Sequence, residues 1–100
     1  MKALKMSKMR SGAGEAARLM RALGNEDRLL LLCQLSQGEL CVGDLEEKTG
    51  IHQPTLSQQL GVLRAQGLAE TRREGKQIFY SLADPGTLAV LRILYERYCG

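Results

Sequence analysis

A tight turn between two short helical segments constrains the fold of this chain more than any other feature of the sequence. The first segment covers residues 42–49 and stops at Gly50, and Pro54 opens the second, which runs to about Gln66. Proline is tolerated in the first turn of a helix because its missing N–H has no partner there, and glycine is favoured just past a helix end. Two short helices joined by a few residues that begin with glycine are typical of a helix-turn-helix unit.

Two more helices are predicted before this unit. Apolar residues recur every three or four positions from Glu15 onward, which indicates an amphipathic helix that ends at Gly24. Asn25 is a favourable N-cap for a second helix over residues 26–36, and the acidic side chains at its start suit the positive end of the helix dipole. This second helix is apolar nearly all round, so we expect it at the centre of the domain.

A β-hairpin and a last helix complete the predicted order. Residues 68–73 and 77–82 alternate apolar and polar side chains around a turn at residues 74–76. Asp84 then caps a final helix that extends to about Tyr98. The order of helices and strands is α-α-α-α-β-β-α, so the predicted fold class is mainly α with a β-hairpin wing, a winged helix-turn-helix.

The chain has 100 residues, which is the size of one small domain. Four basic residues and no acidic residue occupy the first ten positions, and residues 11–14 (S-G-A-G) separate them from the first helical pattern. We therefore expect a basic flexible tail over residues 1–13 and one domain over residues 14–100. The tail is either a solvated segment or a source of non-specific attraction to nucleic acid.

Neither a membrane-spanning segment nor a signal peptide is evident. No apolar run approaches the roughly 20 residues that a membrane helix needs, and basic and polar residues interrupt the N-terminal stretch. Three cysteines in a chain of this length argue against a disulfide scaffold. We therefore expect a cytoplasmic protein whose thiols begin in the reduced state.

The surface of the helix over residues 54–66 is polar without being charged. Leucines form its inward stripe, and no charged side chain lies between His52 and Leu63. Amides and hydroxyls can hydrogen-bond base edges in the major groove, and recognition helices present their N-terminal residues to the bases. The predicted base-reading residues are His52, Gln53, Thr55, Ser57, Gln58 and Gln59. The alternative is a helix face that is merely hydrophilic.

Basic side chains flank this helix. Phosphate contacts fix the register of a protein on DNA without carrying sequence information. We assign that role to Arg64, Arg72, Arg73 and Lys76. Arg72 and Arg73 could instead be solvated charges at the end of a strand, and His52 could be a polar residue of the turn. The predicted partner is therefore double-stranded DNA.

The segment T-L-S-Q-Q-L-G-V-L-R, residues 55–64, is the most specific part of a pattern that resembles the ArsR/SmtB family of small dimeric repressors. The resemblance extends over about residues 15–99. It implies a homodimer joined through the first and last helices, two recognition helices on a palindromic operator, and release from DNA when an inducer binds. A small core that needs further burial fits a dimer. The expected dimer-interface residues are Leu19, Leu88, Leu91, Tyr95 and Tyr98.

Members of the family differ in where their metal ligands or thiols lie, and the metal sites are incomplete here. Arsenic-sensing members carry a three-cysteine box before the recognition helix, and in the corresponding residues 39–46 only Cys41 remains. Several thiolates must converge on a soft ion such as As(III). Zinc-sensing members place Asp and His ligands on the last helix, and this helix has no histidine. We therefore predict no metal site and no cofactor.

The other two cysteines match a branch of the family that senses reactive sulfur species. By that resemblance, Cys33 near the end of the second helix and Cys99 at the end of the last helix form a dithiol, and Cys41 has no part in it. A persulfide is the implied inducer. A di- or polysulfide bridge would then release the operator of genes for sulfide or persulfide detoxification. Taken alone, Cys33 could be a small core residue.

Other functions are compatible with parts of the pattern. A repressor of the same family could respond to a soft metal ion or to peroxide. A thiol enzyme with Cys41 or Cys99 as nucleophile would need a His/Asp partner set, which the sequence lacks beside either thiol, so we predict no enzyme. A winged helix that binds only another protein would show no salt-dependent operator binding.

Overall fold

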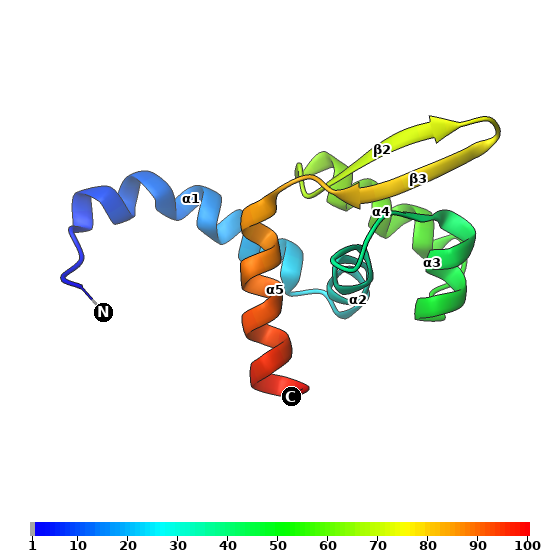
Figure 1. Ribbon diagram of the computed structural model, residues 1–100. Helices are drawn as coiled ribbons and strands as arrows, with labels where there is room; N and C mark the ends of the chain where they lie inside the picture. The colour runs from blue at the N-terminus through cyan, green and yellow to red at the C-terminus, as the bar shows by residue number, and fades with distance from the viewer. Residues whose placement is uncertain (1) are drawn as a thin grey trace.

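The computed structural model describes residues 2–100 and forms a winged helix-turn-helix (Figure 1). The elements in chain order are α1 (Met6–Leu23), α2 (Glu26–Leu35), β1 (Leu40–Cys41), α3 (Val42–Thr49), α4 (Thr55–Ala65), β2 (Ala69–Glu74), β3 (Gln77–Leu82) and α5 (Pro85–Tyr98). The predicted order of helices and hairpin is therefore confirmed. Within the described residues, no helix is both long enough and apolar enough to cross a membrane.

Local signals in the sequence set several helix ends. The side chain of Asn25 accepts a hydrogen bond from the Arg28 backbone N–H at 3.0 Å, so it caps α2 as predicted. Asp84 caps α5 in the same way, through the Gly86 N–H at 3.0 Å. Gly50 follows α3 with a φ of 71°, a left-handed backbone conformation that glycine adopts without steric cost. These caps place the start of α2, the end of α3 and the start of α5 close to their predicted positions.

The first helix is longer than the sequence pattern predicted. α1 begins at Met6, whereas the apolar spacing predicted a start at Glu15, so residues 6–13 of the expected flexible tail are helical. Gly12 and Gly14 lie inside this helix, although a glycine costs a helix about 1 kcal/mol relative to alanine. Most of the other positions hold lysine, methionine, arginine or alanine, which are good helix formers and offset that cost.

The wing contains a third strand that the sequence pattern did not reveal. β1 has two residues and pairs antiparallel with β3, which places Leu40 opposite Tyr80 and Cys41 opposite Phe79. The strand order is β1-β3-β2, and β2 and β3 form the predicted hairpin. Because two residues cannot show the alternation of a longer strand, β1 was not predictable from periodicity.

The hydrophobic core lies between α2, α3 and α4. Leucines from each of these helices are buried, and residues of α5 and of the start of β2 complete the cluster. The most deeply buried leucines are Leu31, Leu32, Leu45, Leu56, Leu60 and Leu63. Burying one leucine side chain contributes about 1.5–3 kcal/mol, so these contacts hold α4 in a fixed orientation. The opposite face of α4 is left to solvent.

α1 and the wing extend from opposite sides of this core (Figure 1). The side chains of residues 6–18 are exposed, and Ala22 and Leu23 are the buried residues at the end of α1. The molecule is therefore elongated, with principal extents of 49 × 29 × 21 Å. Most helical stability in proteins comes from packing of an apolar face. The first part of α1 lacks such packing within this chain.

Candidate functional site

The exposed face of α4 carries polar side chains that were predicted to read bases. Three leucines of α4 pack into the core, which turns Ser57 and Gln58 to solvent. Thr55, at the first position of the helix, is half-buried, and Gln53 is exposed in the turn before it. The structure therefore gathers the predicted residues along the N-terminal half of α4 and the preceding turn.

Hydrogen bonds within the chain orient three of these side chains. Gln53 accepts a bond at its Oε1 from a backbone N–H of α4 at 3.0 Å. His52 Nδ1 lies 3.0 Å from Glu46 Oε2, and the His52 ring is exposed. Gln59 is half-buried, and its Oε1 accepts a bond from Arg28 at 3.0 Å. These contacts limit how each side chain can meet a ligand.

Arg72 is engaged inside the molecule and is not a free cation. Its Nη2 lies 2.7 Å from Glu39 Oε1 and its Nη1 lies 2.7 Å from Glu74 Oε2. The guanidinium also lies 4.7 Å from the centroid of the Phe79 ring. Hydrogen bonds to Glu39 and then to Glu74 raise the pKa of Arg72. Through these contacts Arg72 braces the wing against the segment before β1, while its side chain stays 52% exposed, and its role as a phosphate contact stays a prediction.

The remaining predicted phosphate contacts are exposed. Arg64 lies near the end of α4, and Arg73 and Lys76 lie in the wing. Across residues 2–100, none of these three side chains takes part in an ion pair. Their positive charge is therefore available to an external anion.

Cys33 lines a groove between α2 and α5. It is half-buried near the end of α2, and the groove has a volume of about 500 Å³. Leu88, Leu91 and Tyr95 of α5 also line it. Cys99 directly follows α5 and is exposed. Burial raises the pKa of the Cys33 thiol, and the charge of the Cys99 thiolate raises that pKa further.

Cys41 belongs to a different part of the molecule. It is half-buried in β1, where it pairs with Phe79 of β3 across the sheet. All three cysteines are free thiols. In the part of the chain that the structure describes, no three His, Cys, Asp or Glu side chains are grouped so that they could hold a metal ion.

The expected dimer contacts on α5 separate into core and surface residues. Leu91 is 2% exposed and packs in the core of its own chain, so it is not available to a partner and the expectation for it is corrected. Leu88 is half-buried, whereas Tyr95 and Tyr98 are exposed, Tyr98 by 75%. Ile93 is a further exposed apolar residue of α5, at 65%, and it lies outside the predicted stripe of three- and four-residue spacings.

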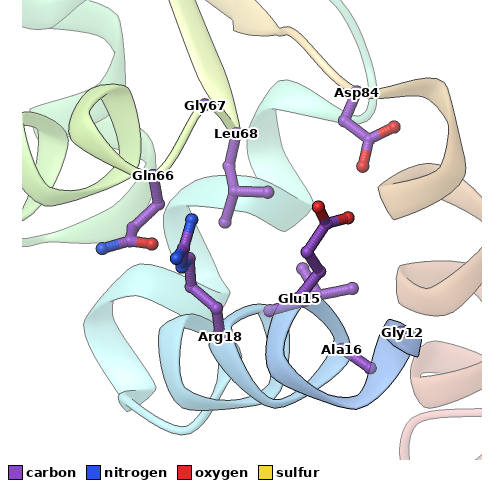
Figure 2. A pocket seen from close by; sticks show the side chains of 9 residues that line it. Gly12, Glu15, Ala16, Arg18, Gln66, Gly67, Leu68 and Asp84 are labelled. Carbon is purple, nitrogen blue, oxygen red and sulfur yellow. The ribbon is translucent and has the colours of Figure 1, made fainter. Parts of the chain in front are cut away.

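Leu19 lines a second groove, beside α1. This groove has a volume of about 450 Å³ and lies between α1 and the turn at residues 66–68. Figure 2 shows Glu15 and Arg18 extending from α1 toward this turn and toward Asp84. An exposed helix beside an open groove gives α1 a surface that a second chain could cover.

Arg28 is a site residue that the sequence analysis missed. It lies in the first turn of α2, and its side chain contacts both the end of α1 and Gln59 of α4. The one signal in the sequence is a basic residue at the start of an otherwise apolar helix. Local pattern does not reveal its partners, because Gln59 lies 31 positions away.

Comparisons with known proteins identify relatives of this chain. Residues 25–71 match the family described as bacterial regulatory protein, arsR family. The chain is 52% identical over 91 residues to the biofilm growth-associated repressor of Agrobacterium fabrum, a match that covers 91% of this chain and 78% of that protein. It superposes on the crystal structure of the transcriptional repressor BigR from Xylella fastidiosa with a TM-score of 0.91 and 46% identity, covering 97% and 99% of the two chains. A homodimeric winged helix-turn-helix DNA-binding domain from Mycobacterium bovis, solved by NMR, gives a TM-score of 0.75 and 32% identity, covering 94% and 86%.

Proposed function

This chain belongs to the arsR family of bacterial regulatory proteins, and from that premise we propose that it is a dimeric repressor that leaves its operator when a persulfide joins Cys33 to Cys99. The relatives are regulators of transcription and not enzymes. The observation that carries the thiol switch is the position of Cys33 in the groove between α2 and α5, the helix that ends at the exposed Cys99.

α4 is the DNA-reading element of the proposal. It enters the major groove and presents Ser57 and Gln58 to base edges, because these polar side chains are exposed at the N-terminal half of the helix. Arg64, Arg73 and Lys76 contact phosphates on either side and fix the register. The Mycobacterium bovis relative, described as a DNA-binding domain, supports this mode of binding.

The dimer is formed by α1 and α5. The exposed first part of α1 and the exposed aromatic residues Tyr95 and Tyr98 of α5 lack packing within one chain. A second copy of the chain covers them and places two α4 helices on a palindromic operator, with half-sites about one helical turn or a multiple of it apart. The homodimeric relative supports this arrangement.

The thiol switch runs in two balanced steps. The Cys99 thiolate, which is exposed, attacks the outer sulfur of a low-molecular-weight persulfide, and the corresponding thiol leaves, so Cys99 becomes a persulfide. The Cys33 thiolate then attacks the inner sulfur on Cys99, which forms the disulfide and expels hydrosulfide. The two protein thiols lose two electrons, and the outer sulfur of the inducer gains them as it becomes sulfide.

A bridge with added sulfur forms by the same chemistry. When Cys33 has also become a persulfide, its outer sulfur attacks the inner sulfur on Cys99, expels one hydrosulfide and leaves a trisulfide. A direct disulfide needs Cα atoms about 4.4–6.8 Å apart, and an extra sulfur relaxes that limit. Either bridge ties α2 to the end of α5 and changes the spacing of the two α4 helices in the dimer. The controlled genes are those for sulfide or persulfide detoxification.

Operator binding and intact mass, measured together, test the switch. Treatment of the reduced protein with glutathione persulfide should weaken operator binding by about 5- to 150-fold, the range of an ordinary coupling between two sites. Peptide mapping should locate the bridge at Cys33 and Cys99. Cys33→Ser and Cys99→Ser proteins should bind the operator when reduced and stay bound after treatment. Cys41→Ser is the matched control and should respond as the unchanged protein does.

The alternative inducers give different results in the same assay. A soft metal ion would weaken operator binding at one ion per subunit without any persulfide. Peroxide would also release the operator without any persulfide, and it would leave only the direct disulfide and never a trisulfide. Normal release of DNA by the Cys33→Ser protein after persulfide treatment would refute the dithiol switch.

A further inference from the structure

The side chain of Arg28 joins three helices. Its Nε donates a hydrogen bond to the Ala22 carbonyl at 2.8 Å, and its Nη2 donates to the Arg21 carbonyl at 3.0 Å, both at the end of α1. Its Nη1 donates to Gln59 Oε1 of α4 at 3.0 Å. Since Arg28 itself lies on α2, a single half-buried guanidinium links α1, α2 and α4.

The bond to the Ala22 carbonyl satisfies a group that needs a partner, whereas the Arg21 carbonyl also accepts from the Gly24 backbone N–H at 3.3 Å. The last four carbonyls of an α-helix have no partner within the helix, and a cation near them is favoured by the helix dipole. Ala22 is buried, so its carbonyl has limited access to water. Arg28 therefore caps the end of α1 from a neighbouring helix.

The bond to α4 fixes which way the Gln59 amide faces. A guanidinium has only donors, so the amide oxygen of Gln59 must face Arg28 and the amide nitrogen must point elsewhere. A glutamine that binds adenine bidentately needs both groups, the oxygen for N6 and the nitrogen for N7. With its oxygen turned to Arg28, Gln59 offers its N–H groups to acceptors such as guanine O6 and N7 or thymine O4. The exposed side chain of Gln58 makes no hydrogen bond among residues 2–100 and keeps both groups available.

We propose that Arg28 is a positioning residue for operator reading: it sets α4 against the end of α1 and presents Gln59 to the bases as a hydrogen-bond donor. The inference rests on the DNA-binding part of the proposed function and is independent of the thiol switch. Because the same guanidinium holds the dimerising helix and the reading helix, a shift of α1 in the dimer is passed directly to α4.

The test uses an operator that the full-length dimer itself selects from random duplex DNA, and every single-base variant of it. Arg28→Met and Gln59→Met should each weaken binding to the selected operator on the order of 10-fold, the value of one specific base contact. Both should lose discrimination at the same base pair, a guanine or a thymine. The double variant should bind the operator about as tightly as the single variant with the lower affinity, because the two residues act as one unit.

Two further variants separate the loss of base reading from a loss of stability and from a general loss of positive charge. Gln59→Glu keeps the link as an ion pair with Arg28 but removes the N–H donors, so its thermal midpoint should match the unchanged protein while discrimination at that base pair is lost. Arg64→Met removes an exposed cation and should weaken all operator variants equally, with a smaller salt dependence.

The outcomes distinguish this inference from the proposed function. The positioning role would be overturned if Arg28→Met weakened binding to all operator variants equally and left the base preference unchanged. It would also be overturned if the Gln59→Glu protein still discriminated fully at that base pair. Should Arg28→Met fail to fold, Gln59→Met and Gln59→Glu decide the question by themselves. Failure of the unchanged protein to select any duplex would instead refute DNA reading as a whole.

Discussion

Cys33 and Cys99 differ in their surroundings, and that difference sets the order in which they react. Cys33 is half-buried, and burial together with the neighbouring Cys99 charge raises the pKa of its thiol. Its thiolate, which is the reactive form, is therefore scarcer at neutral pH than that of an ordinary cysteine. Cys99 is exposed to an incoming persulfide. Cys99 is for these reasons the first nucleophile of the proposed switch, and Cys33 closes the bridge.

The pH dependence of alkylation reports this difference directly. The rate at which iodoacetamide modifies Cys33 should keep rising at pH values where the rate for a cysteine in an unstructured peptide has levelled off, because the raised pKa delays thiolate formation. Cys99→Ser should move the Cys33 profile toward lower pH only in part, since burial is the larger cause of the shift. Initial rates between about pH 6 and 11, read by peptide mass spectrometry, measure both effects. A Cys33 profile that coincides with that of the peptide would contradict the burial argument.

At the scale of one element, α3 offers a matched pair of glycines with opposite roles. Gly50 ends the helix with a φ of 71°, and a Cβ there would meet no atom within 4 Å, so alanine costs only backbone strain of about 1–2 kcal/mol. Gly43 lies inside the helix with equally open surroundings, so alanine there should stabilise by up to about 1 kcal/mol. Urea unfolding at a fixed protein concentration gives both values. If both substitutions changed the free energy of unfolding in the same direction, the left-handed cap would not be what ends α3.

The elements that were predictable carry their signals locally. Asn25, Gly50 and Asp84 mark helix ends by their own side-chain or backbone preferences, and the polar face of α4 follows from residue type alone. The start of α1 was missed because apolar spacing appears only where the helix reaches the core. β1 was missed because its two residues gain a partner only across the sheet.

The site contacts that were missed join residues far apart in the sequence. Arg28 meets Gln59 across 31 positions, and Arg72 meets Glu39 across 33. A local pattern gives the chemistry of each side chain but not its neighbour, because the packing of the helices decides which side chains meet. For Arg72 the unforeseen contact is a brace between the wing and the segment before β1, and for Gln59 it is a bond that orients the amide.

At the scale of the whole molecule, α2 connects the proposed thiol switch to α4, the proposed reading helix. Cys33 lies near one end of this ten-residue helix and Arg28 lies in its first turn. The core holds α2 rigidly, since Leu31, Leu32 and Leu35 are buried. A bridge that pulls the Cys33 end of α2 toward α5 therefore tilts the helix as a unit, and Arg28 carries that motion to α1 and α4. Such a tilt would release the operator only if a dimer converts it into a changed spacing of the two α4 helices, so the proposed switch requires an intact dimer.

We expect the proposed dimer to depend on the projecting part of α1. Its exposed apolar side chains, with those of the residues just before it, are Leu4, Met6 and Met9. Burial of one such side chain contributes about 1.5–3 kcal/mol, so deletion of residues 2–14 should raise the dissociation constant of the dimer by at least about tenfold. Sedimentation velocity over a range of protein concentrations measures this constant.

A charge variant separates dimer formation from attraction to DNA by the same segment. It carries glutamine in place of Lys2, Lys5, Lys8 and Arg10. Glutamine is a good helix former, so α1 and the dimer should persist, while the slope of operator affinity against salt concentration should fall if these cations lie near phosphates. Loss of the dimer in the deletion but not in the charge variant assigns the apolar face of α1 to the partner chain. An unchanged dimer after the deletion would instead leave α5 as the whole interface, and α1 would then lack the packing that explains why it is helical from Met6.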